Sequence, residues 1–481
     1  MLSRDSVIYQ IYPRSYADSN GDGIGDLNGI HDRLEHIVEL GADGIWLSPM
    51  FQSPQHDMGY DVSDYCAIAE EYGDVAAADR LIARAHELGL AVLFDIVPCH
   101  TSIEHPWFRD HPDFYIIRDV PQRPNNWTSM FGGPAWDRDP HGRGWYCHTF
   151  YPEQPNLNWR NPKVVSAMHD VMRFWLDRGL DGFRVDAIGC LFVDDEFRDN
   201  PPATEPPRLN QHPDWAALDH VYNTNRPEVF AALAAIRRDF PSAYFVAEAG
   251  GPIPELARYT EHFDTTFCFQ LLEADAEAAS VASIIAEAAE VPGIAWMIAN
   301  HDFPRLVSRW GREVARAVAA LQLTLPGSAF IYQGDEIGMI DGPGHTPPYD
   351  RVGRDPYRHP MQWTRDGGFT AGEPWLAMVD PAECNVADQR GREGSMLVLY
   401  QQLIAARREI TGPLQNVEVT GSVVSFQRGL HHIAVNLGPT TVPLPAVGRV
   451  VISTHDLSEP DVLPGYSAVI GKDALRDGGV P

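Results

Sequence analysis

Short apolar runs rich in β-branched and aromatic residues alternate with helical stretches over most of the chain. Eight runs have the length of strands, at residues 7–12, 44–48, 91–97, 182–186, 244–248, 263–267, 294–300 and 328–332. Helical patterns lie between them, for example at 80–88, 163–177 and 312–323. Eight strands with helical crossovers fit either a parallel (β/α)8 TIM barrel or a doubly wound sheet. The number eight, and the reactive residues at strand ends described below, favour the barrel.

Two segments interrupt this alternation. Residues 101–160 are rich in Pro, Trp, His, Asn and Asp and lack long periodicity, and a structureless loop of that length is uncommon in a compact domain. We therefore expect a small inserted domain at 101–160, after the third strand. Residues 411–481 carry short strand-like runs separated by turn residues, which predicts a C-terminal all-β domain, a β-sandwich. The barrel is then expected over 1–100 and 161–410.

The composition limits the classes of partner. The formal net charge is −29, which argues against a nucleic-acid partner because a phosphate backbone requires a basic surface. No apolar run reaches the ~18 residues needed to cross a membrane, and the first residues lack the apolar core of a secretory signal. The six cysteines are scattered, with no pair at metal-binding spacing. These features predict a cytoplasmic protein with no membrane partner.

Chemically active side chains stand at the ends of four predicted strands. Each of these strand ends carries a carboxylate, two also carry a histidine, and one also carries an arginine. The residues are Asp95, His100, Arg184, Asp186, Glu248, His301 and Asp302. A single acid at a strand end is usually a helix cap or a solvated loop residue. Four such ends in chain order favour an active site, because the strands of a barrel all end at one rim.

Several carboxylates around one pocket suit cleavage of a glycosidic bond. The leaving oxygen needs a proton, and the oxocarbenium-like carbon needs an anion. Arg184 lies two residues before Asp186, so both side chains point to the same side of a strand. We expect this cation to lower the pKa of Asp186 and to keep it nucleophilic.

These four segments resemble the short conserved regions of the α-amylase superfamily, glycoside hydrolase family 13. The resemblance extends over nearly the whole chain and is greatest to the branch of oligo-1,6-glucosidases and α-glucosidases. It includes VIYQIYPRSY at 7–16, DMGYDVSDY at 57–65, QPNLNW at 154–159, YQGDE at 332–336 and HPMQW at 359–363. The family usually has Asn at the position of Cys99, so an amylase-type calcium site is not expected there.

The resemblance implies a role for each matching residue. Asp186 corresponds to the nucleophile, Glu248 to the general acid/base, and Asp302 to the third carboxylate, which binds sugar hydroxyls and stabilises the transition state. The substrate-binding residues that it implies are Arg184 beside the nucleophile, His100 and His301 on the sugar, and Tyr60 as an aromatic platform.

The family's exo-acting members close the pocket around the terminal glucose with an ion pair. Asp61 and Arg354 resemble that pair, with Arg358 as the alternative arginine. Phe150 and Gln154 are further candidates to line the pocket, although packing of the inserted domain explains them equally well.

A metal loop is predicted after the first strand. Oxygen ligands at alternate positions are supplied by Asp18, Asn20, Asp22, the Ile24 carbonyl and Asp26. The loop is not an EF-hand, because glycine stands where the bidentate Glu would be and a strand precedes it. The same branch of the family has a metal loop at this place. Calcium is expected there, with magnesium as the second choice, and an acidic turn without metal is the alternative.

The expected function is a retaining, exo-acting α-glucosidase for short oligosaccharides or glucosides. Ala187 follows the nucleophile, and in this branch Ala or Thr there is more typical of α-1,4 than of α-1,6 specificity, although it can also serve barrel packing. A transglucosidase, a sucrose isomerase and a trehalose-forming mutase use the same residues and stay as alternatives. A non-enzymatic scaffold is disfavoured because all three carboxylates are intact and no membrane anchor is recognisable.

Overall fold

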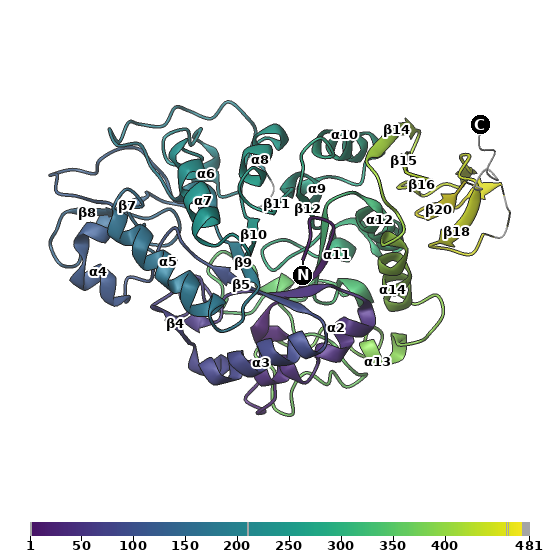
Figure 1. The fold of residues 1–481 in the computed structure, drawn as a ribbon, viewed down its shortest axis with the longest axis horizontal. Helices are drawn as coiled ribbons and strands as arrows, with labels where there is room; N and C mark the ends of the chain where they lie inside the picture. Colours follow the sequence, from purple (N-terminus) through teal and green to yellow (C-terminus); the bar gives the residue numbers. More distant parts are fainter. Residues whose placement is uncertain (1, 209–210, 458, 460, 474–481) are drawn as a thin grey trace.

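A computed structural model describes residues 2–208, 211–457, 459 and 461–473 (Figure 1). Its centre is a closed barrel of eight parallel strands in the order β1-β13-β12-β11-β10-β9-β5-β2. The strands are β1 (Val7–Ile11), β2 (Gly44–Leu47), β5 (Ala91–Ile96), β9 (Gly182–Val185), β10 (Tyr244–Ala247), β11 (Thr265–Phe267), β12 (Ile294–Trp296) and β13 (Ser328–Tyr332). Each predicted run contains one barrel strand, so the predicted (β/α)8 barrel is confirmed.

Most strands end earlier than the sequence predicts. β9 stops at Val185, one residue before Asp186, and β10 stops at Ala247, one residue before Glu248. β12 ends at Trp296, four residues before the predicted end. Asp186, Glu248 and Asp302 therefore lie in the loops that leave the strands, whereas Asp95 and Arg184 lie within β5 and β9.

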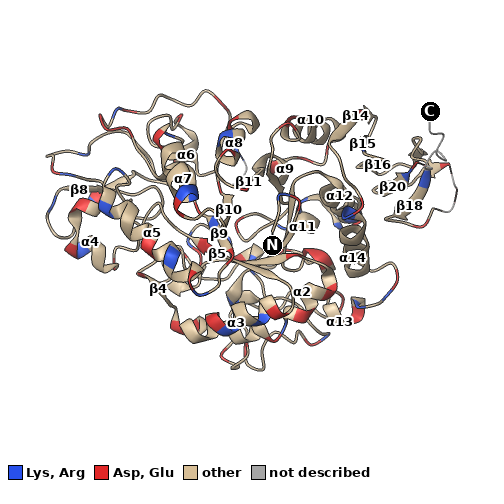
Figure 2. Ribbon diagram, in the orientation of Figure 1, with Lys and Arg blue, Asp and Glu red and all other residues tan. Residues whose placement is uncertain are grey.

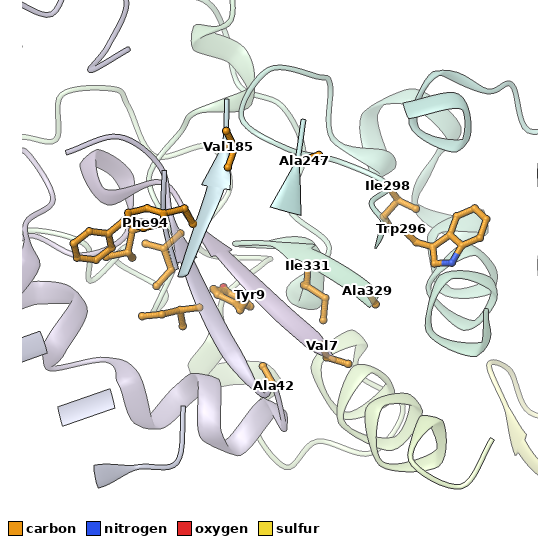
Figure 3. Close-up of a cluster of buried hydrophobic side chains, with 14 of the residues drawn as sticks. Val7, Tyr9, Ala42, Phe94, Val185, Ala247, Trp296, Ile298, Ala329 and Ile331 are labelled. Atoms are coloured by element: carbon orange, nitrogen blue, oxygen red, sulfur yellow. The ribbon is translucent and has the colours of Figure 1, made fainter. Parts of the chain in front are cut away.

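The barrel strands are buried on both faces, as expected of a parallel sheet covered by helices. Along β1 the side chains alternate: Ile8 packs inside the barrel with Trp46 and Leu93, whereas Val7 and Tyr9 pack in the outer layer against the helices. Figure 3 shows part of this outer layer, with side chains from several barrel strands. Because side chains fill the interior, the barrel has no open channel, and its ligand site is at one end.

Helices surround the barrel. The longer ones are α2 (Leu34–Leu40), α3 (Val75–Glu87), α5 (Pro162–Leu176), α7 (Glu228–Asp239), α8 (Ile253–Thr260), α10 (Ala278–Ala288), α12 (Arg312–Thr324) and α14 (Met396–Arg407). The short ones are α1 (Leu27–His31), α4 (Pro106–Asp110), α6 (Pro213–Ala216), α9 (Phe269–Glu273), α11 (Leu306–Trp310) and α13 (Val386–Gln389). Figure 2 shows charged residues on helices such as α2 and α3. The acidic excess therefore includes residues on the helical layer.

Local sequence explains where these helices begin. Asp74 caps α3 by accepting a hydrogen bond from the Ala77 N–H, and Asn161 caps α5 by accepting one from the Lys163 N–H. Proline at the first position of α5 has no N–H that would need a partner there. α3 begins five residues before the predicted start, because Asp74 opens the helix ahead of its most apolar part.

The segment between β5 and α5 forms its own small sheet. β6 (Ile117–Arg118), β8 (Trp145–Cys147) and β7 (Trp136–Arg138) pair in that order. A separate two-stranded sheet, β3 (Phe51–Gln52) and β4 (Asp64–Ile68), lies in the loop after β2. Trp127 and Trp136 are almost fully buried and stack on each other, with ring centroids 5.9 Å apart. These tryptophans hold an irregular segment together, since its short strands bury little surface on their own.

The C-terminal part is all antiparallel. Its main sheet has the order β14-β15-β16-β20-β18. The strands are β14 (Leu414–Thr420), β15 (Val423–Arg428), β16 (His431–Asn436), β18 (Arg449–Ser453) and β20 (Ala468–Lys472), and β17 (Val442–Pro443) pairs with β19 (Val462–Leu463). The main sheet contacts α10 and α12 of the barrel (Figure 1). The last residues of the predicted domain, 474–481, lie outside the described residues. Within the described part of the chain, no helix has the length and apolarity to cross a membrane.

Candidate active site

A cavity of about 950 Å³ opens at the carboxyl ends of the barrel strands. The predicted site residues that line it are Tyr60, His100, Phe150, Asp186, Glu248, Asp302 and Arg354. Arg184, His301 and Gln154 lie directly behind this lining and are buried. The structure thus brings together residues from segments that are up to about 300 positions apart in the chain.

The floor of the cavity is organised by the buried guanidinium of Arg184. Its Nη1 donates to Asp186 Oδ1 at 2.6 Å and to Asp95 Oδ1 at 2.7 Å, and its Nη2 lies 2.9 Å from Glu248 Oε2. Asp95 is in β5, directly beside Arg184 in the β5–β9 register. One cation therefore binds three carboxyl groups. The sequence placed Asp95 at this rim but assigned it no role.

Burial and the shared contact with Arg184 together set the pKa values of Asp186 and Asp95. Burial raises the pKa of Asp186 well above its ordinary value; Arg184 lowers it, while the charges of Glu248 and Asp95 raise it. Burial likewise raises the pKa of Asp95 to about 7, against the lowering effect of Arg184. The expectation that Arg184 leaves Asp186 with a lowered pKa is wrong, because it considered one neighbour and not the burial and the two competing carboxylates. Asp95 therefore retains its proton into the neutral range, and Asp186 holds its proton to a higher pH than an exposed aspartate does.

A second chain of contacts runs through His301. Gln10 Nε2, a donor, lies 2.9 Å from His301 Nδ1, so Nδ1 is the acceptor and Nε2 carries the proton. His301 Nε2 then donates to the Tyr60 hydroxyl at 2.6 Å, and this hydroxyl donates to Asp95 Oδ2 at 3.1 Å. Burial lowers the pKa of His301 to about 3, so the ring is neutral at physiological pH. The Tyr60 and His301 rings also stack, with centroids 5.6 Å apart.

Asp302 lies on the cationic side of the site. Its Oδ1 accepts from Arg354 Nη1 at 2.9 Å and from Arg358 Nη2 at 3.0 Å. Burial alone raises the pKa of Asp302, but His301, Arg354 and Arg358 lower it more, so that it falls well below the ordinary value. Asp302 is therefore ionised at a lower pH than Asp95 and Asp186, so the site contains two different carboxyl environments.

The structure corrects the partner of Arg354. Arg354 Nη2 donates to Asp57 Oδ1 at 2.5 Å, so the ion pair contains Asp57 and not Asp61. Asp61 is fully buried, and its carboxylate accepts hydrogen bonds from Ser53 Oγ and from the backbone N–H groups of residues 56 and 57. Its role is to fold the loop. Spacing alone did not separate the two aspartates, because the chain reverses at Gly59, which has φ +103°.

Gln154 supports the same wall from the inserted segment. Its Nε2 donates to Asp57 Oδ2 at 2.9 Å and lies 3.0 Å from His100 Nε2. Burial lowers the pKa of His100 to about 4, so this ring is neutral as well. The Phe150 ring packs on His100 with centroids 5.2 Å apart and faces the cavity. Of the two candidates from this segment, Phe150 lines the cavity and Gln154 lies behind it.

The predicted metal loop folds around its own side chains. Asp18 accepts hydrogen bonds from three backbone N–H groups of the loop and from Thr370 Oγ1; although burial opposes them, these bonds lower its pKa. Asn20 and Asp22 each accept one bond from the N–H two residues later, so both keep acceptor capacity. Asp26 differs, since its carboxylate caps α1 and binds Ser19.

These donors are all oxygen atoms, which suits calcium or magnesium rather than zinc. In the described parts of the chain, however, no three His, Cys, Asp or Glu side chains lie close enough together to hold a metal ion. The side chains of Asp18, Asn20 and Asp22 and the Ile24 carbonyl fit a hard cation, whereas Asp26 is already committed to the helix.

Replacing Asp95 with Asn is expected to make the protein relatively more stable as the pH rises. The carboxyl has a folded-state pKa of about 7, above its unfolded value, so it destabilises the fold progressively as pH rises between these values. The melting temperature of Asp95→Asn minus that of the wild type should be more positive at about pH 8 than at about pH 5. For the control Asp79→Asn, at an exposed site on α3, the melting temperature of the variant minus that of the wild type should be the same at both pH values. If the melting temperature of Asp95→Asn relative to wild type fell as the pH rose, the raised pKa of Asp95 would be contradicted.

Comparison with known proteins agrees with this geometry. Residues 10–412 match the family model described as "Alpha amylase, catalytic domain", and residues 414–470 match a domain of unknown function, DUF3459. A probable alpha-glucosidase of Rhizobium meliloti is 40% identical over 477 residues, covering 88% of this chain and 86% of that protein. An oligo-1,6-glucosidase of Heyndrickxia coagulans is 37% identical over 478 residues, covering 84% of each.

A solved structure gives the same result for the fold. The alpha-glucosyl transfer enzyme XgtA superposes with a TM-score of 0.90 at 35% sequence identity, covering 98% of this chain and 99% of that one. The family model spans most of the chain, and its catalytic domain includes all the carboxylates described above. The chain therefore belongs to the α-amylase family and is a glycoside hydrolase related to the α-glucosidases and oligo-1,6-glucosidases.

Proposed function

We propose that the protein is a retaining, exo-acting α-glucosidase that removes terminal glucosyl units from short oligosaccharides or glucosides. The observation that carries this proposal is the shared guanidinium of Arg184. It holds Asp186 through Nη1 and Glu248 through Nη2, so the two carboxyl groups lie close together. Retention requires a short separation, about 5–5.5 Å, whereas inversion needs room for a water between the carboxyl groups.

In the first step Asp186 attacks the anomeric carbon and the glycosidic bond breaks. Glu248 gives its proton to the leaving oxygen, and a covalent glucosyl ester on Asp186 results. In the second step Glu248 takes a proton from water, the water oxygen attacks the anomeric carbon, and the ester bond to Asp186 breaks. The backbone N–H of Ala187 donates to Glu248 Oε2 at 2.7 Å, which orients that carboxyl toward its partner.

Exo action is supported by the Asp57–Arg354 pair at the cavity wall. Both side chains line the cavity and both are largely buried, so the pair presents charged hydrogen-bonding groups to the hydroxyls of a terminal sugar. Arg354 also binds Asp302, which ties the wall to the third carboxylate. A chain that continued past the terminal glucose would have to displace this ion pair.

Preference for α-1,4 linkages rests on Ala187. Ala187 lines the cavity and has left-handed backbone angles, with φ +43°, which is uncommon for a residue with a side chain. This strained position beside the nucleophile is typical of a functional site. The small side chain takes up less of the cavity than a larger residue would at this position.

Transfer of glucose to another sugar is the second candidate function. It is supported by the 35% identity to XgtA, which is described as an alpha-glucosyl transfer enzyme. The same two-step chemistry gives transfer or isomerisation when a sugar hydroxyl replaces water in the second step. A cavity of about 950 Å³ has space for an acceptor sugar beside the bound glucose.

Proton NMR of the first products distinguishes these functions. With maltose, isomaltose, sucrose and trehalose as separate substrates, we expect α-glucose to be released first, and fastest from maltose. The β-anomer should appear only later, by mutarotation. New glycosidic signals with little free glucose would establish transfer or isomerisation in place of hydrolysis. β-Glucose as the first product would exclude retention.

Replacement of Glu248 with Gln should abolish hydrolysis of these natural glucosides while sugar still binds. The amide cannot supply a proton to the leaving oxygen, but it keeps the size and one acceptor of the carboxyl. Turnover and the glucose dissociation constant are the quantities to measure. Glu261→Gln, at an exposed position, serves as the matched control. Near wild-type turnover by Glu248→Gln would remove Glu248 from the proposed mechanism.

We propose further that the loop after β1 binds calcium, with magnesium as the second choice. Asp18, Asn20, Asp22 and the Ile24 carbonyl would hold the ion, which would stabilise the loop without taking part in bond cleavage. The Thr370 contact joins this loop to the long segment after β13. The ion would therefore strengthen a link between two loops.

Calcium should raise the melting temperature of chelator-treated protein by preferential binding to the folded state. Asp22→Ala should lose that increase, because this carboxylate makes only one hydrogen bond within the loop and is free to bind the ion. Asp32→Ala, just beyond the loop and exposed, should keep it. An equal calcium effect in wild type and Asp22→Ala would place the ion elsewhere, and no effect at all would contradict a metal loop.

A cytoplasmic location is also proposed. All six cysteines are unpaired in the structure, and five of them are buried. Unpaired cysteines are typical of proteins in a reducing compartment.

A further inference from the structure

An ion pair at the edge of the active cavity, with Arg351 in the cavity lining and Glu153 behind it, connects the inserted segment to the loop after β13. Arg351 Nη1 lies 3.2 Å from Glu153 Oε1, and Nη2 lies 2.9 Å from Glu153 Oε2, so the two groups meet in the two-pronged geometry favoured by Arg and carboxylate. The Arg351 guanidinium also lies over the Tyr151 ring, 3.8 Å from its centroid. Arg351 itself lines the cavity.

This ion pair runs parallel to the proposed glucose-binding wall. Glu153 precedes Gln154, which donates to Asp57, and Arg351 lies three residues before Arg354, which pairs with Asp57. The inner link therefore runs Gln154–Asp57–Arg354, and the outer link runs Glu153–Arg351. Both links join the same two segments of the chain.

Both segments are rigid enough to transmit a displacement. In the inserted segment, the Tyr151 N–H donates to Gln154 Oε1 at 2.9 Å, and the Gln154 N–H donates to the Tyr151 carbonyl at 2.9 Å. In the other loop, Asp350 accepts from the Arg354 N–H at 2.7 Å and from Arg354 Nε at 3.0 Å. Movement at Glu153 or Arg351 would therefore shift Gln154 or Arg354.

We propose that Glu153 and Arg351 are positioning residues that act as an outer latch, holding the inner Gln154–Asp57–Arg354 wall in the geometry that binds the terminal glucose. The proposal rests on the proposed function, in which this wall binds that glucose. In the described part of the chain, the latch residues pair with each other and form no hydrogen bond or ion pair with Asp186 or Glu248, so the latch affects binding of the sugar and not the bond-breaking step.

The latch is more exposed than the wall that it supports. The side chains of Arg351 and Glu153 are 44% and 28% exposed, against 13% and 5% for Arg354 and Asp57. Salt screens exposed ion pairs much more strongly than buried ones. The latch should therefore loosen at high ionic strength while the inner pair stays intact, which gives it a distinct experimental signature.

The test compares Arg351→Ala and Glu153→Gln with wild type on p-nitrophenyl α-glucoside. Each variant should raise KM about two- to fivefold, the range expected for a partly exposed ion pair, and should leave kcat nearly unchanged. Raising sodium chloride from about 0.05 M to about 1 M should bring the wild-type KM toward that of the variants. The KM of the variants should change little over the same range.

Two further variants separate positioning from general structure. Arg351→Lys keeps the charge but loses the two-pronged contact, so its KM should fall between those of wild type and Arg351→Ala. Arg178→Ala removes an ion pair with Asp79 of similar exposure on the barrel surface, and it should leave KM and its salt dependence as in wild type. Melting temperatures close to wild type would show that all variants are folded.

The dissociation constant of glucose provides an independent readout and should rise by the same factor as KM. Unchanged KM and glucose affinity in both Arg351→Ala and Glu153→Gln would overturn the latch, as would a fall in kcat at constant KM. A wild-type protein that fails to cleave the glucoside would overturn the proposed function instead. The latch would then be judged by glucose affinity alone.

Discussion

The structure of the active site depends on the contact of one guanidinium group with three carboxyl groups. Arg184 reaches Asp95, Asp186 and Glu248 only because β5, β9 and β10 are neighbours in the barrel with the observed register. A slip of one residue in β9 would turn Arg184 to the opposite face of the strand and remove the cation from the site. Barrel closure, strand register and the catalytic geometry are therefore a single structural requirement.

Charge in the site is divided into two unequal environments. Around Arg184, three carboxyl groups share one cation, and the pKa values of Asp186 and Asp95 are raised by burial. Around Asp302, two arginines bind one carboxylate, which stays ionised. The fold supplies this difference through the ratio of guanidinium to carboxyl groups on each side.

The floor of the site could be predicted from the sequence because its carboxylates lie near the ends of barrel strands in the chain. A buried run followed by Asp186, Glu248 or Asp302 places the carboxylate at the barrel rim, and all three line the cavity. The pKa of Asp186 was mispredicted because burial raises it, and because two neighbours that raise it further, Glu248 and Asp95, come from other strands. For most strands, the predicted last residue lies further along the chain than the observed one. Apolar residues continue into loops whose backbone no longer pairs with a neighbouring strand.

The wall of the site was harder to predict because it is assembled from three distant segments. Asp57, Gln154 and Arg354 meet only in three dimensions, and Asp61 instead of Asp57 was predicted from the sequence as the partner of the arginine. The choice between the two aspartates is made by the chain reversal at Gly59 and by hydrogen bonds that commit Asp61 to its own loop. Such a wall can change by loop substitution without disturbing the barrel. Differences in substrate among related enzymes are therefore expected to arise in this wall, while the carboxylate floor stays the same.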